Sequence, residues 1–125
     1  MAVKKKAGRK TLPPFEFTVA IEGTKVAIVG KNDGNIRARK QPVVKFVAGP
    51  GVGKFKIDAT EFQENDNPNR PPKAWPFKKA KPAGVVSRFS SRLVRPARGA
   101  SLLIFKYTVA VPGFTPADPV IIIEQ

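Results

Sequence analysis

The sequence contains no cysteine and no histidine. Without cysteine the chain can form neither disulfides nor thiolate metal sites, and without histidine it lacks the imidazole that serves as a general base or a zinc ligand. These absences exclude cysteine nucleophiles, histidine-based triads and zinc centres that depend on either residue. The composition therefore predicts a protein that is not an enzyme and that uses no cofactor.

Long apolar stretches are also missing. Apolar runs such as 102–105 and 120–123 are far shorter than the roughly 20 residues that a membrane-spanning helix needs. The first ten residues carry positive charges but no apolar stretch after them, unlike a secretory signal. We therefore expect a soluble protein without a membrane span, located in the cytoplasm or in a virion.

Acidic residues are scarce. The chain has 9 Asp and Glu against 23 Lys and Arg, which gives a formal net charge of +14. This charge is larger than the solubility of a small domain requires, so it favours a negatively charged partner such as nucleic acid, an anionic membrane surface or an acidic protein assembly. The alternative is a highly charged surface that has no dedicated partner.

The charges are segregated along the chain. No acidic residue lies between Asp66 and Asp118, whereas ten basic residues do, and five more lie within the first ten positions. Trp75 and Phe77 lie among these cations and could stack on single-stranded bases; alternatively, they close one end of the fold. The predicted polyanion-binding residues are Lys4, Lys5, Lys6, Arg9, Lys10, Arg70, Lys73, Trp75, Phe77, Lys78, Lys79, Lys81, Arg88, Arg92, Arg95 and Arg98.

Residues 1–11 are predicted to form a flexible basic arm, because they lack the apolar bulk that offsets the entropy of ordering. The remaining residues, 12–125, have the length of one domain. Within them, 67–84 contains five prolines, which oppose both a helix and a central strand. We expect a long irregular loop there, of the kind that is often functional.

Alternation of apolar and polar residues predicts strands, most clearly over 15–22 and 102–111. About seven extended segments separated by glycine and proline turns indicate an all-β fold, a single β-sandwich. Residues 85–95 fit either a short helix or a short strand. Arg88 and Arg92 share a face in both interpretations.

Two motifs are interpreted as turns. Segment 48–55 resembles a phosphate-binding loop, but Phe55 stands where that motif has a magnesium-binding hydroxyl, and a strand pattern follows where the motif has a helix. The only cluster of acids shows no spacing that favours catalysis or calcium binding over a solvated turn. It consists of Asp58, Glu61, Glu64 and Asp66.

The C-terminal third carries a resemblance. Residues 107–111, a proline-glycine turn and residues 118–124 resemble the closing hairpin of small cupredoxin-like or immunoglobulin-like sandwich domains. Copper-binding cupredoxins use two histidines, a cysteine and commonly a methionine, whereas the only methionine here is Met1. The resemblance therefore implies architecture and not electron transfer.

The overall organisation, a basic arm before a β-sandwich, is similar to that of viral coat and capsid-associated proteins. This similarity implies a subunit whose arm neutralises packaged nucleic acid or bridges neighbouring copies. We therefore predict a structural or binding protein, able to act as a homo-oligomer or assembly subunit, that engages DNA or RNA without sequence specificity. The alternative is an interaction module that docks on acidic protein surfaces.

Overall fold

The computed structural model describes residues 14–61, 75–95 and 102–124, so the predicted arm lies outside the described residues. The described chain is all-β and contains no α-helix. Its elements are β2 (Phe15–Glu22), β3 (Lys25–Val29), the 3-10 turn η1 (Lys31–Gly34), β4 (Ile36–Arg39), β5 (Val43–Ala48), β6 (Lys56–Glu61), β7 (Arg88–Arg92), β8 (Leu102–Ala110) and β9 (Val120–Glu124).

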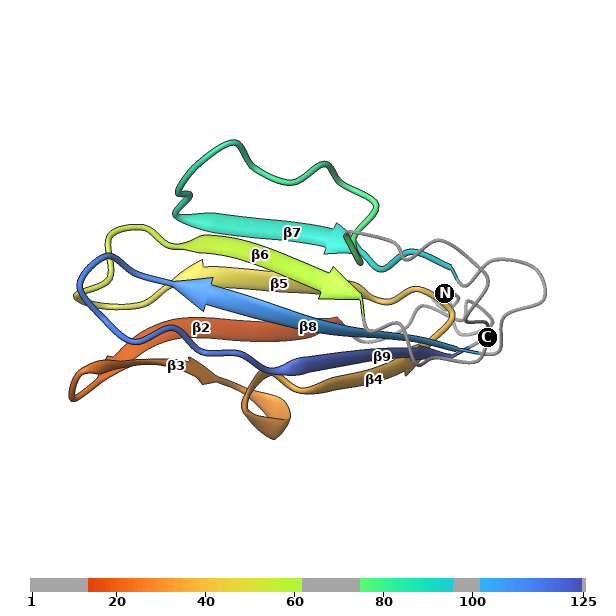
Figure 1. Ribbon diagram of the computed structural model, residues 1–125, viewed down its shortest axis with the longest axis horizontal. Helices are drawn as coiled ribbons and strands as arrows, with labels where there is room; N and C mark the ends of the chain where they lie inside the picture. The colour runs from red at the N-terminus through yellow and green to blue at the C-terminus, as the bar shows by residue number, and fades with distance from the viewer. Residues whose placement is uncertain (1–13, 62–74, 96–101, 125) are drawn as a thin grey trace, which may run out of the picture.

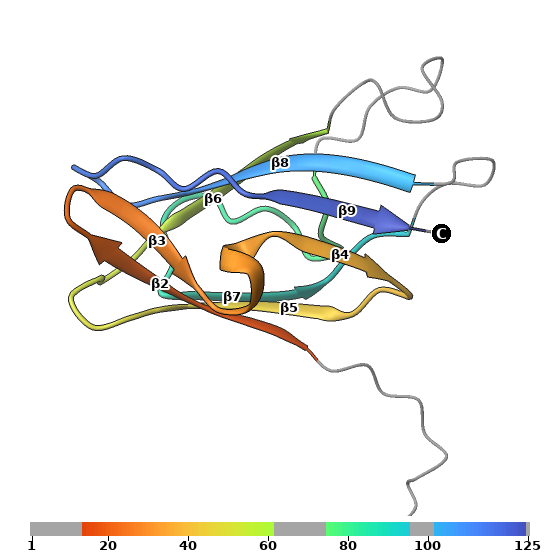
Figure 2. The ribbon, with the colours of Figure 1, turned by 90° about the horizontal axis from the view of Figure 1, so that it is seen from below.

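The strands form two four-stranded sheets, with the orders β3-β2-β5-β7 and β4-β9-β8-β6. Figure 2 shows them as two layers, with β8 and β9 in one and β2, β5 and β7 in the other. Both sheets are mixed, because β2 runs parallel to β5 and β4 runs parallel to β9. The predicted all-β sandwich is thereby confirmed.

The space between the sheets is filled by large aromatic and branched side chains. Phe46 of β5 lies among three other rings, with centroid distances of 5.3 Å to Phe17, 5.7 Å to Tyr107 and 6.4 Å to Phe77. The ring of Phe46 has no exposed surface. Strict alternation in β8, with every second residue buried, explains why the sequence pattern of this strand is so clear.

Residues 88–92 form a strand, β7, and not the alternative helix. Phe89 and Ser91 point into the sandwich, while Arg88, Ser90 and Arg92 point outward. The antiparallel pairing of β7 with β5 satisfies the backbone groups that a helix would have satisfied internally.

The described part of the proline-rich loop is more regular than the prolines predict. The amide of Lys78 donates to the carbonyl of Arg92 at 2.9 Å, and the amide of Val94 donates to the carbonyl of Pro76 at 2.8 Å. Proline removes a donor but keeps its acceptor, so Pro76 still takes part in this short pairing. Residues 76–78 are thereby fixed along the end of β7.

The glycine-rich segment is a turn followed by a strand, as interpreted from the sequence. The amide of Val52 donates to the carbonyl of Gly49 at 3.0 Å, and Gly51 has a φ of 81°. Phe55 then pairs with Val86 in an isolated antiparallel bridge before β6 begins. No helix N-terminus follows this loop, so the geometry that holds a nucleotide phosphate is missing at this position.

Candidate polyanion-binding surface

The outward face of β7 carries two arginines, and the neighbouring strand places a lysine between them. Arg88 lies opposite Val47 and Arg92 lies opposite Val43 in the pairing of β7 with β5, while Lys45 lies opposite Ser90. All three charged side chains point to the solvent side of the sheet. The three cations therefore share one face along the edge of the sheet, because β7 is an edge strand.

Three more cations lie around the end of β7. The backbone of Lys78 pairs with Arg92, and the amide of Lys79 donates to Ser91 Oγ at 2.8 Å. Lys79 Nζ also lies 5.7 Å from the centroid of the Phe89 ring, a geometry that favours a cation. Arg95 is exposed directly beyond the strand. We call this surface the β7 basic edge; it consists of Lys45, Lys78, Lys79, Arg88, Arg92 and Arg95.

Gln41 holds two of these arginines in place. Its backbone carbonyl accepts from Arg92 at 3.0 Å, its side-chain oxygen accepts from Arg95 at 3.2 Å, and its side-chain amide donates to the carbonyl of Leu93 at 3.3 Å. Lys40 and Gln41 both have a positive φ, 68° and 59°, which costs about 1–2 kcal/mol per residue outside glycine. The bonds of Gln41 offset part of this cost and fix the end of the edge.

Acidic neighbours are few at this edge. Among the residues that the structure describes, Glu16 is the one acid that forms an ion pair with it, at 3.7 Å from Lys45 Nζ. The Glu16 side chain is 64% exposed, and such surface pairs contribute little energy. The other described ion pairs lie elsewhere, so the β7 basic edge keeps most of its positive charge.

One predicted cation lies away from this edge. Lys81 Nζ contacts Asp58 Oδ1 of β6 at 2.5 Å. The hydrogen bond from Lys81, partly opposed by desolvation, holds the pKa of Asp58 below its ordinary value. Lys81 is therefore already paired with a carboxylate, and it joins the opposite sheet rather than the β7 basic edge.

The two aromatic residues pack inward, as the alternative interpretation expects. Phe77 is 2% exposed and meets Phe89 edge to face at 5.2 Å. Trp75 is half-buried against the same pair of rings, and its Nε1 donates to the carbonyl of Lys79 at 2.7 Å. Phe77 offers no free face to a base in this packing, so we remove it from the contact surface.

The remaining predicted contacts lie outside the described residues, although their points of attachment are clear. β2 begins and β7 ends at the same end of one sheet, and β6 ends and β8 begins at the same end of the other, as the pairings within each sheet require. The right-hand end of Figure 1 shows these strand ends together. The undescribed segments 1–13, 62–74 and 96–101 adjoin these strands in the sequence. The predicted residues within them are Lys4, Lys5, Lys6, Arg9, Lys10, Arg70, Lys73 and Arg98.

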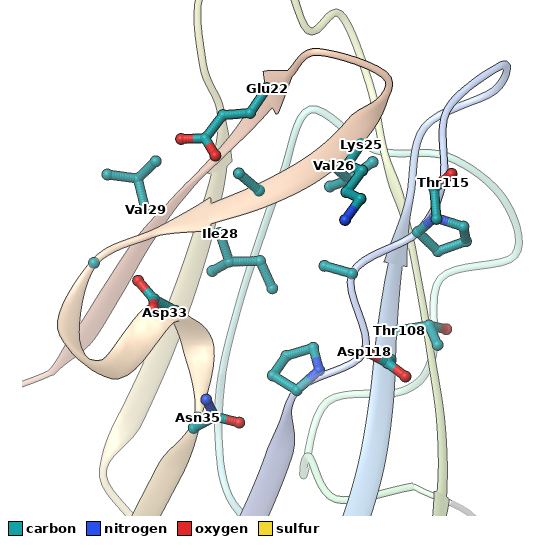
Figure 3. A pocket seen from close by; sticks show the side chains of 15 residues that line it. Glu22, Lys25, Val26, Ile28, Val29, Asp33, Asn35, Thr108, Thr115 and Asp118 are labelled. Carbon is teal, nitrogen blue, oxygen red and sulfur yellow. The ribbon is translucent and has the colours of Figure 1, made fainter.

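A different groove has the opposite charge. It has a volume of about 960 Å³ and lies between β3 and residues 115–119. Figure 3 shows Glu22, Asp33 and Asp118 at separate places around it, with Lys25 on one wall. No group of three side chains able to hold a metal ion occurs in the described part of the chain. This groove is therefore a poor site for a polyanion.

Sequence reasoning missed Lys45 of the β7 basic edge. Lys45 comes between Arg88 and Arg92 only through strand register, which no local pattern reports.

None of the described residues builds a helix with the length and apolarity to cross a bilayer. No protein-family model, curated protein or solved structure matches the chain.

Proposed function

We propose that this protein is a non-enzymatic structural or binding protein that engages nucleic acid, or a nucleic-acid-containing assembly such as a virion, through the β7 basic edge. The observation that carries the proposal is the cluster of six cations on and around β7, with a single weakly paired acid among the described residues. Rows of Lys and Arg bind phosphates by charge neutralisation and counterion release.

The proposed binding is independent of base sequence. Lysine and arginine contacts to phosphate position a protein on nucleic acid but read no bases. Around the β7 basic edge the described uncharged polar side chains include Gln41, Ser87, Ser90 and Ser91, and Gln41 and Ser91 already form hydrogen bonds within the protein. Few free hydrogen-bonding side chains therefore remain at this edge to distinguish one base from another.

Three of the described carboxylates are already paired with cations, which favours a non-catalytic role for them. Asp58, Asp118 and Glu124 each contact a lysine or arginine. General acid-base chemistry by carboxylates needs two of them in different environments. These three do not form such a pair, because each contacts a cation.

The test replaces Arg88, Arg92 and Arg95 together by glutamine and measures binding of single-stranded DNA by fluorescence anisotropy at several salt concentrations. Each phosphate contact on a single strand contributes about −0.7 to the slope of log affinity against log salt. The variant should therefore bind more weakly, with a slope flatter by about 2. The melting temperature should fall only modestly, because the three side chains are exposed but Arg92 and Arg95 each donate a hydrogen bond to Gln41.

The matched control removes the same charge elsewhere by replacing Lys25, Lys56 and Lys106 with glutamine. Lys25 lies on the opposite edge strand of the same sheet, and Lys56 and Lys106 lie on the outer face of the other sheet. This control should nearly keep the native slope. Equal losses in both triple variants would show that net charge alone drives binding and would contradict the proposed edge. Binding of an acidic protein but of no nucleic acid would favour the docking module instead.

A further inference from the structure

A second pocket lies close to the β7 basic edge, between the start of β2 and the edge strand β4. It has a volume of about 500 Å³, which is within the range of small-ligand sites. Its apolar lining includes Phe15, Ala38 and Pro42. Pro42 follows Gln41, which holds Arg92 and Arg95, so the pocket and the β7 basic edge are neighbours.

Three cations surround this apolar lining: Lys31, Arg37 and Arg39. Lys31 Nζ lies 6.0 Å from the centroid of the Phe15 ring. Arg37 and Arg39 alternate outward from β4, and their side chains are 66% and 65% exposed. An apolar ring beside several cations is the combination that binds a base and its phosphate together.

The two arginines already converge on one anion. Arg37 contacts Glu124 Oε2 at 2.6 Å, and Arg39 Nε contacts Oε1 of the same carboxylate at 3.3 Å. Each guanidinium has five N–H donors, so most donors remain open after this contact. One carboxylate leaves the group of three cations with a positive balance, and the acid that lines the pocket, Glu16, is largely exposed and lies 3.7 Å from Lys45.

We infer that this pocket takes one unpaired nucleotide of a bound strand, with its base against Phe15 and its phosphate at Arg37 and Arg39, so that the polyanion is single-stranded. The inference rests on the proposed function and adds a strand preference to it. A base inside a duplex is stacked and paired on all sides and cannot enter such a pocket without being flipped out. The β7 basic edge alone carries no such preference.

The experiment compares three labelled ligands of 12 nucleotides on the native chain: oligo-dT, an abasic strand with the same phosphates, and a blunt duplex. Oligo-dT should bind about tenfold more tightly than the abasic strand, since a stacked base contributes about 1–3 kcal/mol. The duplex should bind more weakly than oligo-dT, although its charge density is higher.

Phe15→Leu keeps apolar bulk but removes the aromatic face. It should weaken oligo-dT binding about tenfold and leave abasic binding unchanged, whereas Phe15→Trp should retain the affinity for oligo-dT. Arg37→Gln combined with Arg39→Gln should flatten the salt slope for oligo-dT by about 0.7, because the two arginines share one phosphate. Melting temperatures of all variants identify any loss of folding, and Phe15→Trp provides a second readout if Phe15→Leu is destabilised.

Equal affinity for the three ligands, or an equal effect of Phe15→Leu on oligo-dT and the abasic strand, would overturn the inference. In both cases the proposed function survives if the β7 basic edge variants still lose affinity. Absence of binding to all three ligands at low salt would remove the proposed function and this inference together.

Discussion

Replacement of Phe46 by alanine should lower the free energy of unfolding by about 3–5 kcal/mol. Phe46 is fully buried and lies within 6.4 Å, between ring centroids, of Phe17, Phe77 and Tyr107. These three rings come from both sheets and from the proline-rich loop. The cavity left by alanine would therefore loosen three parts of the sandwich at once. Urea unfolding followed by Trp75 fluorescence measures the change.

The neighbouring residue supplies the control. Val47 follows Phe46 on the same strand but points outward and is 44% exposed. Val47→Ala should change the free energy of unfolding by less than about 0.5 kcal/mol, as is usual for surface positions. If Phe46→Ala leaves too little folded protein to measure, Phe46→Leu should show a smaller loss in the same direction. Similar effects of Phe46→Ala and Val47→Ala would mean that Phe46 is not at the centre of the core.

Alkaline pH should unfold the protein through Tyr107. Tyr107 is fully buried, and desolvation raises the pKa of its hydroxyl well above the ordinary value of 10.0. The hydroxyl donates to the carbonyl of Gly34 at 2.5 Å, so the neutral form is the one that the fold accepts. The stabilisation by neutral Tyr107 is complete below the unfolded-state pKa and is lost as the pH rises above it. The free energy of unfolding should then fall by about 1.4 kcal/mol per pH unit.

Tyr107 is the only tyrosine in the chain, so tyrosinate absorbance reports this residue alone. We expect no tyrosinate signal above pH 10 until the protein unfolds, and then a signal that coincides with the unfolding transition. Tyr107→Phe keeps every lysine, so it separates the ionisation of Tyr107 from the titration of lysines. It should remove the decrease in the free energy of unfolding that Tyr107 causes at alkaline pH. It should also cost about 1–3 kcal/mol at neutral pH, because the carbonyl of Gly34 loses its partner. A normal tyrosinate titration in the folded protein would refute this description of the site.

Much of the fold could be predicted because its signals are local. Alternation marks β2 and β8 directly, since one face of each strand is buried. Residues 85–95 are ambiguous in the sequence, because a short segment rich in serine and arginine fits the periodicity of a helix and that of a strand equally well. Pairing with β5 settles it as a strand, and that pairing is a tertiary interaction.

The surface was less predictable, because it depends on which strands meet. The basic stretch containing Arg88 and Arg92 was visible in the sequence, but the position of Lys45 between them was not. The pocket near Phe15 also joins distant segments, with Arg37 and Arg39 coming from the other sheet. Gln41 has a positive φ without being glycine or asparagine, so its turn carries no sequence signal.

The most direct test of the proposed polyanion binding is the salt dependence of the native chain's affinity for oligo-dT. Six cations of the β7 basic edge that each neutralise one phosphate give a slope of log affinity against log salt of about −4 or steeper. Single strands of different sequence should also bind alike, because phosphate contacts carry no base information. A flat salt dependence, or no binding even at low salt, would contradict the account.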